Sequence, residues 1–171
     1  RVEINTFFAD RERDDLLLLY FSCHGIKDED GILYFSTTDT KCNLLPATAI
    51  DSPFVNKIMQ RSRSRKQVLL LDCCYSGAFA RGTSARAGMA IDTKERFDGK
   101  GIFVLTVSDA MQYSFEGDHV KGVTEPSVFT SSLVHGLKTG AADSDGDGDI
   151  TPDELYEYVY KTVIDKKPEQ R

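Results

Sequence analysis

The chain lacks the hallmarks of several protein classes. Cysteine is scarce, with four among 171 residues, and the four do not form the pattern of a small disulfide-stapled secreted domain. The longest purely apolar run, residues 16–21, falls far short of the roughly 20 residues that a membrane-spanning helix needs. Basic charge is not in excess, because 21 Lys and Arg residues stand against 27 Asp and Glu residues, giving a net charge of −6. We therefore expect no nucleic-acid or membrane partner, and a reducing, cytoplasmic location.

The length suits a single domain with a core of its own. Three short, unbroken apolar runs predict strands covered on both faces, as in a parallel sheet: residues 16–22, 67–72 and 101–108. Apolar residues at helical spacing predict helices over residues 47–61, 129–137 and 153–164. An Asp30-Gly31 turn before an apolar segment, residues 32–36, predicts a small hairpin. Strands that alternate with helices predict an α/β fold.

Reactive side chains follow each of the three apolar runs. His24 follows the first run, Cys73 and Cys74 follow the second, and Asp109 follows the third. Because sites in such sheets lie at the carboxyl ends of the strands, we expect these groups to converge on one edge. A thiolate assisted by an imidazole can attack a carbonyl carbon. The backbone amides around Gly25 and Cys74 could then receive the oxyanion.

Other interpretations of the cysteine pair remain open at this point. Cys73 and Cys74 could both be small buried hydrophobic residues, as reduced cysteines often are. A zinc site is disfavoured, because adjacent cysteines cannot easily supply two ligands to one tetrahedral ion, and no pair has the usual ligand spacing. A thiol phosphatase is disfavoured because Arg81 lies one residue too far beyond Cys74.

Two segments carry a resemblance to a known family. Residues 20–25 (YFSCHG) and 69–79 (LLLDCCYSGAF) closely resemble the paired motifs of the caspase-like cysteine peptidases of clan CD, and the nearest branch looks like the metacaspases and their bacterial relatives. The resemblance implies a caspase-like fold, a mostly parallel sheet flanked by helices. It also implies that His24 is the catalytic base and Cys74 the nucleophile, whereas Cys73 falls on a variable position and packs. Cys23 stands where the family usually has glycine.

The resemblance runs over nearly all of the chain and implies one caspase-like domain, residues 1–171. The family normally has a further strand, helix and strand before the YFSCHG segment. We therefore expect that the first strand or strands and a helix are missing here, and that another segment or further domains of the same protein cover the sheet edge they leave. Residues 78–100 are rich in small and charged residues and predict a mobile loop. Cleavage within this loop could activate the peptidase.

Two acidic residues match the substrate pocket of metacaspase-like enzymes. The resemblance places Asp72 and Asp109 there, and two carboxylates facing one cavity favour a guanidinium by bidentate pairing. We therefore expect protein or peptide substrates cleaved after Arg, and less well after Lys, with no cofactor required for the chemistry. The alternative role of Asp72 is to cap a following helix.

Residues 143–154 match a twelve-residue EF-hand calcium loop, with Gly148 at its sharp turn. The oxygen ligands would come from Asp143, Asp145, Asp147, the Asp149 carbonyl, Thr151 and Glu154. A plain acidic turn between helices is the alternative, since EF-hands normally occur in pairs. The loop also keeps open a second function, that of a calcium-sensing or interaction module on a catalytically silent caspase fold.

Overall fold

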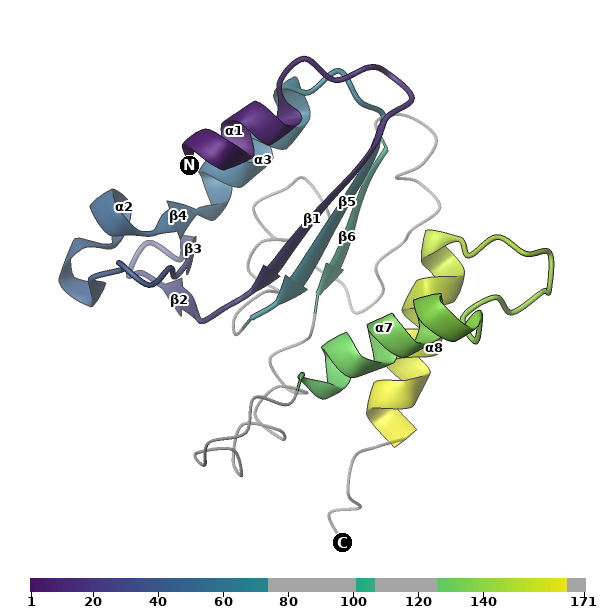
Figure 1. Ribbon diagram of the computed structural model, residues 1–171. Helices are drawn as coiled ribbons and strands as arrows, with labels where there is room; N and C mark the ends of the chain where they lie inside the picture. Colours follow the sequence, from purple (N-terminus) through teal and green to yellow (C-terminus); the bar gives the residue numbers. More distant parts are fainter. Residues whose placement is uncertain (74–100, 107–125, 166–171) are drawn as a thin grey trace, which may run out of the picture. The chain divides into compact units, whose positions relative to one another are not determined.

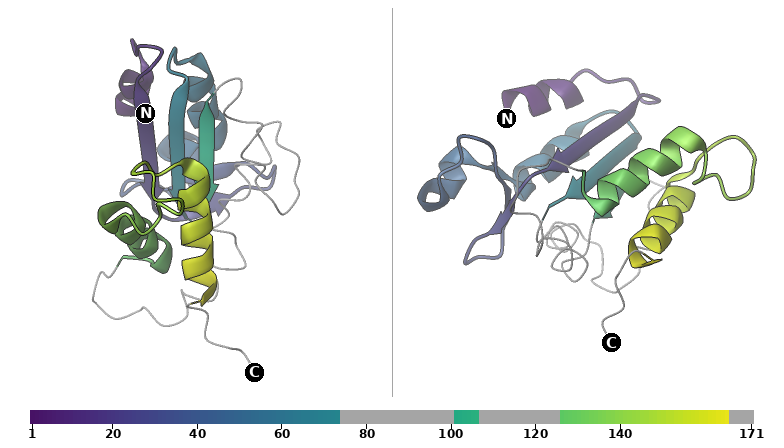
Figure 2. Two further views of the ribbon diagram at one scale, coloured as in Figure 1. Left: turned by 90° about the vertical axis from the view of Figure 1, so that its right-hand side faces the viewer. Right: turned by 60° about the horizontal axis from the view of Figure 1, so that its bottom comes forward.

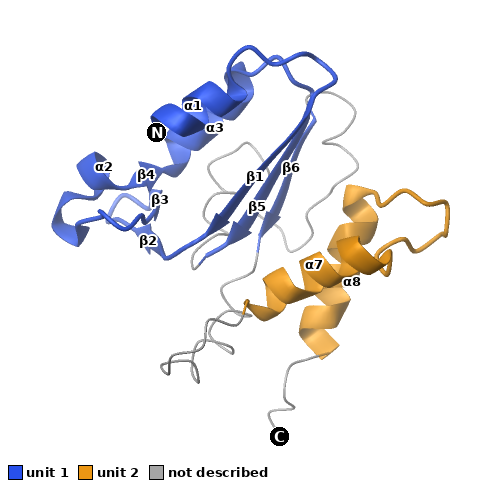
Figure 3. Ribbon diagram, in the orientation of Figure 1, with its two compact units in different colours: residues 1–109 blue, residues 110–171 orange. Residues whose placement is uncertain are grey.

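The computed structural model describes residues 1–73, 101–106 and 126–165 (Figure 1). The chain divides into two compact units, residues 1–109 and residues 110–171 (Figure 3). The predicted loop over residues 78–100 lies outside the described residues.

A parallel sheet forms the centre of the first unit. Its strands are β1 (Leu16–Ser22), β5 (Lys66–Asp72) and β6 (Ile102–Thr106), in the order β1-β5-β6. The three apolar runs therefore form the strands that they predict, within one or two residues for the part of the chain described. Leucine-rich runs can also form helices, but six or seven residues are too few for a stable helix and enough for a strand.

Two helices cover one face of this sheet. The helices α1 (Val2–Phe8) and α3 (Ser52–Arg61) lie on the same side of the three strands in both orientations (Figures 1 and 2). Alternate residues of each strand point to this side, as strand geometry requires. The buried residues of the resulting core are Phe8, Leu17, Leu33, Phe35, Val55, Ile58, Met59, Leu69, Leu71, Cys73 and Val104.

The opposite face of the sheet is not uniformly covered. Leu70 of β5 is 2% exposed, whereas Leu16 and Leu18 of β1 are 68% and 49% exposed. The prediction that all three runs are covered on both faces is therefore wrong for β1. Both β1 and β6 lie at edges of the described sheet, and Phe103 and Leu105 of β6 are buried, so the exposure belongs to one face of β1 and not to edge strands in general.

A small antiparallel sheet follows the end of β1. It contains β2 (Gly25–Lys27), β3 (Leu33–Phe35) and β4 (Ile50–Asp51), in that order. The amide of Gly31 donates to the carbonyl of Asp28 at 3.0 Å and closes the turn between β2 and β3. The predicted hairpin is therefore confirmed.

The predicted helix over residues 47–61 is wrong at its beginning. A short 3-10 helix, η1 (Cys42–Leu44), leads into the single turn α2 (Leu45–Thr48) and then into β4. The long helix α3 begins only at Ser52, because the Asp51 carboxylate accepts a hydrogen bond from the Phe54 amide at 2.8 Å and caps it. Pro53 lies in the first turn, where its missing N–H costs nothing.

The described part of the second unit, residues 126–165, contains α7 (Val128–Thr139) and α8 (Pro152–Asp165), which confirms the two helices predicted there. A methyl group on Gly136 would lie 2.7 Å from the Tyr158 ring, so the helices approach closely at this point. His135 Nδ1 forms a 2.7 Å hydrogen bond with the Tyr158 hydroxyl beside this contact. The histidine therefore joins the two helices.

A pair of glycine substitutions tests the connection into β6. Gly101 has a φ of +48°, and a Cβ there would overlap the Arg65 carbonyl oxygen. Gly140, which ends α7, has a φ of +75° but nothing within 4 Å of such a Cβ. We expect Gly101→Ala to lower the free energy of unfolding by about 3 kcal/mol or more, because the backbone must move. Gly140→Ala, the control, should cost about 1 kcal/mol for its backbone conformation alone.

Urea unfolding followed by circular dichroism measures both variants. Equal losses of stability would contradict the close contact between Gly101 and Arg65.

Candidate active site

The ends of β1 and β5 lie side by side at one edge of the parallel sheet. The strands pair from Leu16 with Lys66 through to Ser22 with Asp72. The pairing continues one residue further, since the Cys23 amide donates to the Asp72 carbonyl at 3.3 Å. The carboxyl ends of the two motif-bearing strands are thus brought together, as the order of apolar runs predicts.

His24 is held by its backbone at the junction of the two sheets. Its carbonyl oxygen accepts two hydrogen bonds from Ser36, one from the amide at 3.0 Å and one from the hydroxyl at 2.7 Å. Gly25, the next residue, is buried and pairs with Phe35. The imidazole itself is on an exposed residue. The chain therefore fixes where His24 stands while leaving its ring accessible to a substrate.

The two adjacent cysteines differ in what the structure describes. Cys73 is fully buried within the core, where strand alternation places it with Leu69 and Leu71. Cys74 lies outside the described residues, and so does Asp109. The described part of the chain therefore brings His24, Gly25 and Asp72 to one edge of the sheet and leaves the other two predicted residues undescribed.

Asp72 ends β5 on the face of the sheet opposite α1 and α3. Its carboxylate accepts a hydrogen bond from the Tyr20 hydroxyl at 3.4 Å, a long contact between exposed groups. Tyr20 is on β1 and is 40% exposed. The acid of this motif therefore faces away from the helix-covered core, on the side where the sheet is open beside β1.

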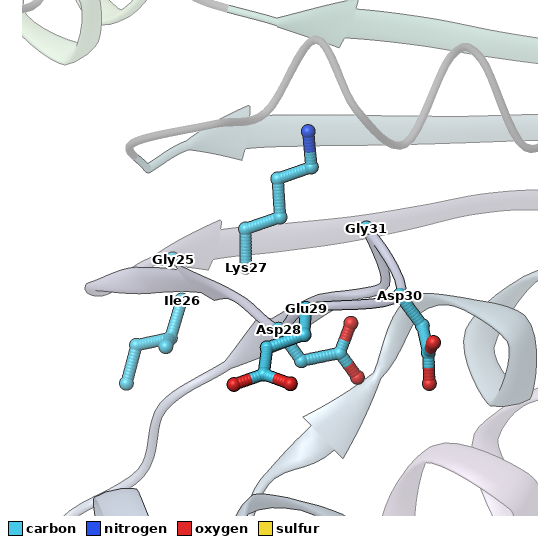
Figure 4. Close-up of a pocket in the computed structure, with 7 residues that line it drawn as sticks. All are labelled: Gly25, Ile26, Lys27, Asp28, Glu29, Asp30 and Gly31. Carbon is cyan, nitrogen blue, oxygen red and sulfur yellow. The ribbon is translucent and has the colours of Figure 1, made fainter.

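An open pocket adjoins His24 along the β2–β3 hairpin and is lined by residues 25–31 (Figure 4). The Lys27 side chain extends to one side of the hairpin, and the carboxylates of Asp28, Glu29 and Asp30 lie on the other (Figure 4). Gly25 directly follows His24, so the pocket begins beside the candidate base, and the three acids lie farther along the hairpin.

A contact between Cys23 and Cys73 was not foreseen. Each cysteine comes one residue after the end of its strand, so parallel pairing places them next to each other. A hydrogen bond from the Cys73 thiol lowers the pKa of Cys23, against the effect of burial. The signal was present in the sequence, since both cysteines follow predicted strands directly.

The acidic loop of the second unit is compact. Among the described residues, one carboxylate oxygen each from Asp143, Asp145 and Asp147 lie within 4.8 Å of one another. Asp143 accepts hydrogen bonds from the amides of Gly146 at 2.7 Å and Gly148 at 3.0 Å. These bonds fold the loop around the three carboxylates. Gly148, at the predicted sharp turn, has a φ of +92°.

Glu154, the last of the predicted ligands, binds Thr151 and Ser144 and does not join the three clustered carboxylates. Its carboxylate accepts hydrogen bonds from the amide and hydroxyl of Thr151, at 2.9 and 2.8 Å, and from the amide and hydroxyl of Ser144, at 2.8 and 2.9 Å. These bonds, those from Thr151 first, lower the pKa of Glu154 to about 2. Thr151 and Glu154 thereby form a capping box at the start of α8. Glu154 does not belong to the group of three clustered carboxylates, and Asp149 lies exposed in the same loop.

The part of the chain that the structure describes contains no helix that is both long and apolar enough to cross a membrane.

Comparison with known families agrees with the α/β fold. Residues 1–170 match the caspase domain, a family of peptidases. A search of curated proteins found no match to the chain. The family match spans nearly the whole sequence and includes both strands that end at the candidate site. The chain therefore belongs to the caspase domain family of cysteine peptidases.

Proposed function

We propose that the chain is a cysteine endopeptidase in which Cys74 and His24 form a catalytic dyad. The observation that carries the proposal is the parallel pairing of β1 and β5, which ends with Ser22 beside Asp72. His24 and Cys74 each follow two residues later in their own segments. The burial of Cys73 supports Cys74 as the nucleophile, because a thiol enclosed in the core cannot reach a peptide.

The chemistry would run through a covalent intermediate. The Cys74 sulfur attacks the carbonyl carbon of the scissile bond after its proton passes to His24. The amides of Gly25 and Cys74 stabilise the oxyanion of the tetrahedral intermediate. The intermediate then collapses, the C–N bond breaks, and His24 returns the proton to the leaving amine. Water activated by His24 hydrolyses the remaining thioester and regenerates the thiol.

We propose cleavage after Arg and, less efficiently, after Lys, as in metacaspase-like enzymes. Asp72 supports this preference, because its carboxylate lies at the site edge of the sheet, away from the core. With Asp109 it would accept hydrogen bonds from the N–H groups along the edges of a guanidinium. The hairpin acids Asp28, Glu29 and Asp30 favour basic peptides through their field.

Regulation is also proposed, through cleavage of residues 78–100 or through a covering segment or partner. The exposed apolar side chains of Leu16 and Leu18 on the edge strand support a covering segment, because apolar edges invite pairing.

A second candidate function is calcium binding by residues 143–154. The observation that favours it is the cluster of carboxylate oxygens from Asp143, Asp145 and Asp147 within a loop that has the EF-hand spacing. Asp149 would contribute its carbonyl oxygen, Thr151 a further oxygen, and Glu154 would have to exchange its hydrogen bonds for the ion. Bound calcium would then replace these capping bonds at the start of α8 and could regulate the peptidase. A calcium-sensing module on a catalytically silent fold is the alternative.

The nucleophile is tested by a matched pair of variants. Cys74→Ala should reduce kcat/KM on an arginyl peptide by at least about a thousandfold, because the attacking sulfur is gone. Cys73→Ala should retain most of the activity and lose about 1 kcal/mol of stability, because it removes a buried sulfur. Fluorogenic turnover and thermal unfolding measure the two effects. Loss of activity in Cys73→Ala alone would overturn the assignment, and an inactive natural chain would favour the silent module.

Substrate preference is tested with peptides that differ only before the scissile bond. We expect turnover of the Arg peptide to exceed that of the Lys peptide, and the Asp peptide not to be cleaved. Asp72→Asn should lower kcat/KM for the Arg peptide roughly ten- to a hundredfold, since a charge-assisted hydrogen bond is lost. Asp39→Asn, on an exposed residue outside the proposed site, is the control. Preferential cleavage after Asp would rule out the proposed pocket.

Calcium binding is tested with the metal and a chelator. We expect calcium to raise the melting temperature and a chelator to reverse the rise, because the ion binds only the folded loop. Asp145→Asn should weaken the response, whereas Asp153→Asn, an exposed acid that is not a predicted ligand, should not. A melting temperature that is the same with calcium and with chelator would leave the loop a purely structural turn.

A further inference from the structure

Cys23 and Cys73 lie next to each other at the ends of neighbouring strands. The pairing of Ser22 with Asp72, followed by the hydrogen bond from the Cys23 amide to the Asp72 carbonyl, places the two cysteines in adjacent positions. Strand alternation directs both side chains to the core face, where Cys73 is part of the core and Cys23 packs against it. The Cys73 thiol acts on Cys23 as a hydrogen-bonding neighbour and lowers its pKa.

The backbone spacing at this position suits a disulfide. Neighbouring strands lie about 4.8 Å apart. Disulfides join residues whose Cα atoms are roughly 4.4–6.8 Å apart. The two thiols can therefore be joined without unfolding either strand.

The two thiols differ in their access to reagents. Cys73 is 0% exposed, whereas Cys23 is half-buried. The hydrogen bond from Cys73 lowers the pKa of Cys23, and the nearby Ser36 backbone acts in the same direction, against burial and the nearby Asp72 charge. The thiol that an oxidant can reach is thus the one whose thiolate is stabilised, and the enclosed thiol beside it is placed to react next.

We propose that Cys23 and Cys73 form a reversible disulfide on exposure to hydrogen peroxide and that this bond switches off the neighbouring peptidase site. The Cys23 thiolate attacks one peroxide oxygen, the O–O bond breaks, and hydroxide leaves, giving a sulfenic acid at Cys23. The Cys73 sulfur then attacks the Cys23 sulfur and expels hydroxide, which takes the Cys73 proton and leaves as water. A dithiol reductant supplies the two electrons that reverse the reaction.

The effect on activity rests on the proposed function, because Cys23 adjoins His24 and Cys73 adjoins Cys74 in the chain. A disulfide requires Cβ atoms about 3.8 Å apart, so closing it draws the two strand ends together. Displacing a catalytic group by about 1 Å can reduce the rate a hundredfold. Oxidation should therefore lower peptidase activity without removing either member of the dyad.

The bond itself is tested in the full chain carrying Cys74→Ala. This substitution removes the neighbouring thiol, and the test does not require the chain to be active. The protein is treated with hydrogen peroxide, the remaining thiols are alkylated, and the tryptic peptides are analysed by mass spectrometry with and without reductant. We expect residues 14–27 to be linked to residues 67–81, with Cys42 alkylated. Sulfinic acid at Cys23 with Cys73 alkylated, or a link to the exposed Cys42, would overturn the proposal.

The switch is tested by activity in the chain with Cys74 intact. We expect peroxide to reduce turnover of an arginyl peptide about tenfold or more, and dithiothreitol to restore it. Cys23→Gly, which carries the residue usual in the family, should keep its activity at the same dose, and the control Cys42→Ala should respond like the natural chain. Equal inhibition of Cys23→Gly would overturn the switch. If the untreated chain cleaves no peptide, the proposed function fails, while the mass spectrum still decides the disulfide.

Discussion

The parallel pairing of β1 with β5 is the constraint on which the candidate site depends. Seven consecutive residue pairs, from Leu16 with Lys66 to Ser22 with Asp72, set the strands in register. Because side chains alternate along a strand, this register also sets which residues face the core, Cys73 among them, and which face outward, such as Asp72. A shift by one residue would exchange the two sets. The core between the sheet and the helices α1 and α3 resists such a shift, since it would expose Leu69 and Leu71.

Much of this arrangement follows from the sequence, because short local patterns determine both the strands and the edge of the sheet at which their ends meet. Short leucine-rich runs predict the strands, and parallel order predicts that their carboxyl ends meet. The interval between Thr48 and Ser52 could not be predicted in the same way, since apolar spacing continues through it while the Asp51 cap decides where α3 begins. The exposed face of Leu16 and Leu18 was also missed, because an apolar run does not reveal which of its two faces other segments cover.

The two units use acidic residues differently. In the first, Asp72 lies at the end of a strand near a half-exposed face, with the Tyr20 hydroxyl as a partner. In the second, Glu154 is tied into the start of α8 by four hydrogen bonds, so its charge already stabilises the helix. These four hydrogen bonds therefore fix the end of the acidic loop against the start of α8.

The most direct test of the account is covalent labelling by a peptidyl chloromethyl ketone. Its last residue, next to the reactive ketone, is arginine. The reagent transfers its peptide to an activated nucleophile that recognises arginine, and mass spectrometry identifies the modified residue. The account predicts a single label on Cys74, none on Cys73 or Cys23, and a strong decrease in labelling in His24→Ala, because the thiolate is no longer assisted. A label on Cys73 would contradict the account. Equally fast labelling by the same reagent with aspartate in place of arginine would also contradict it.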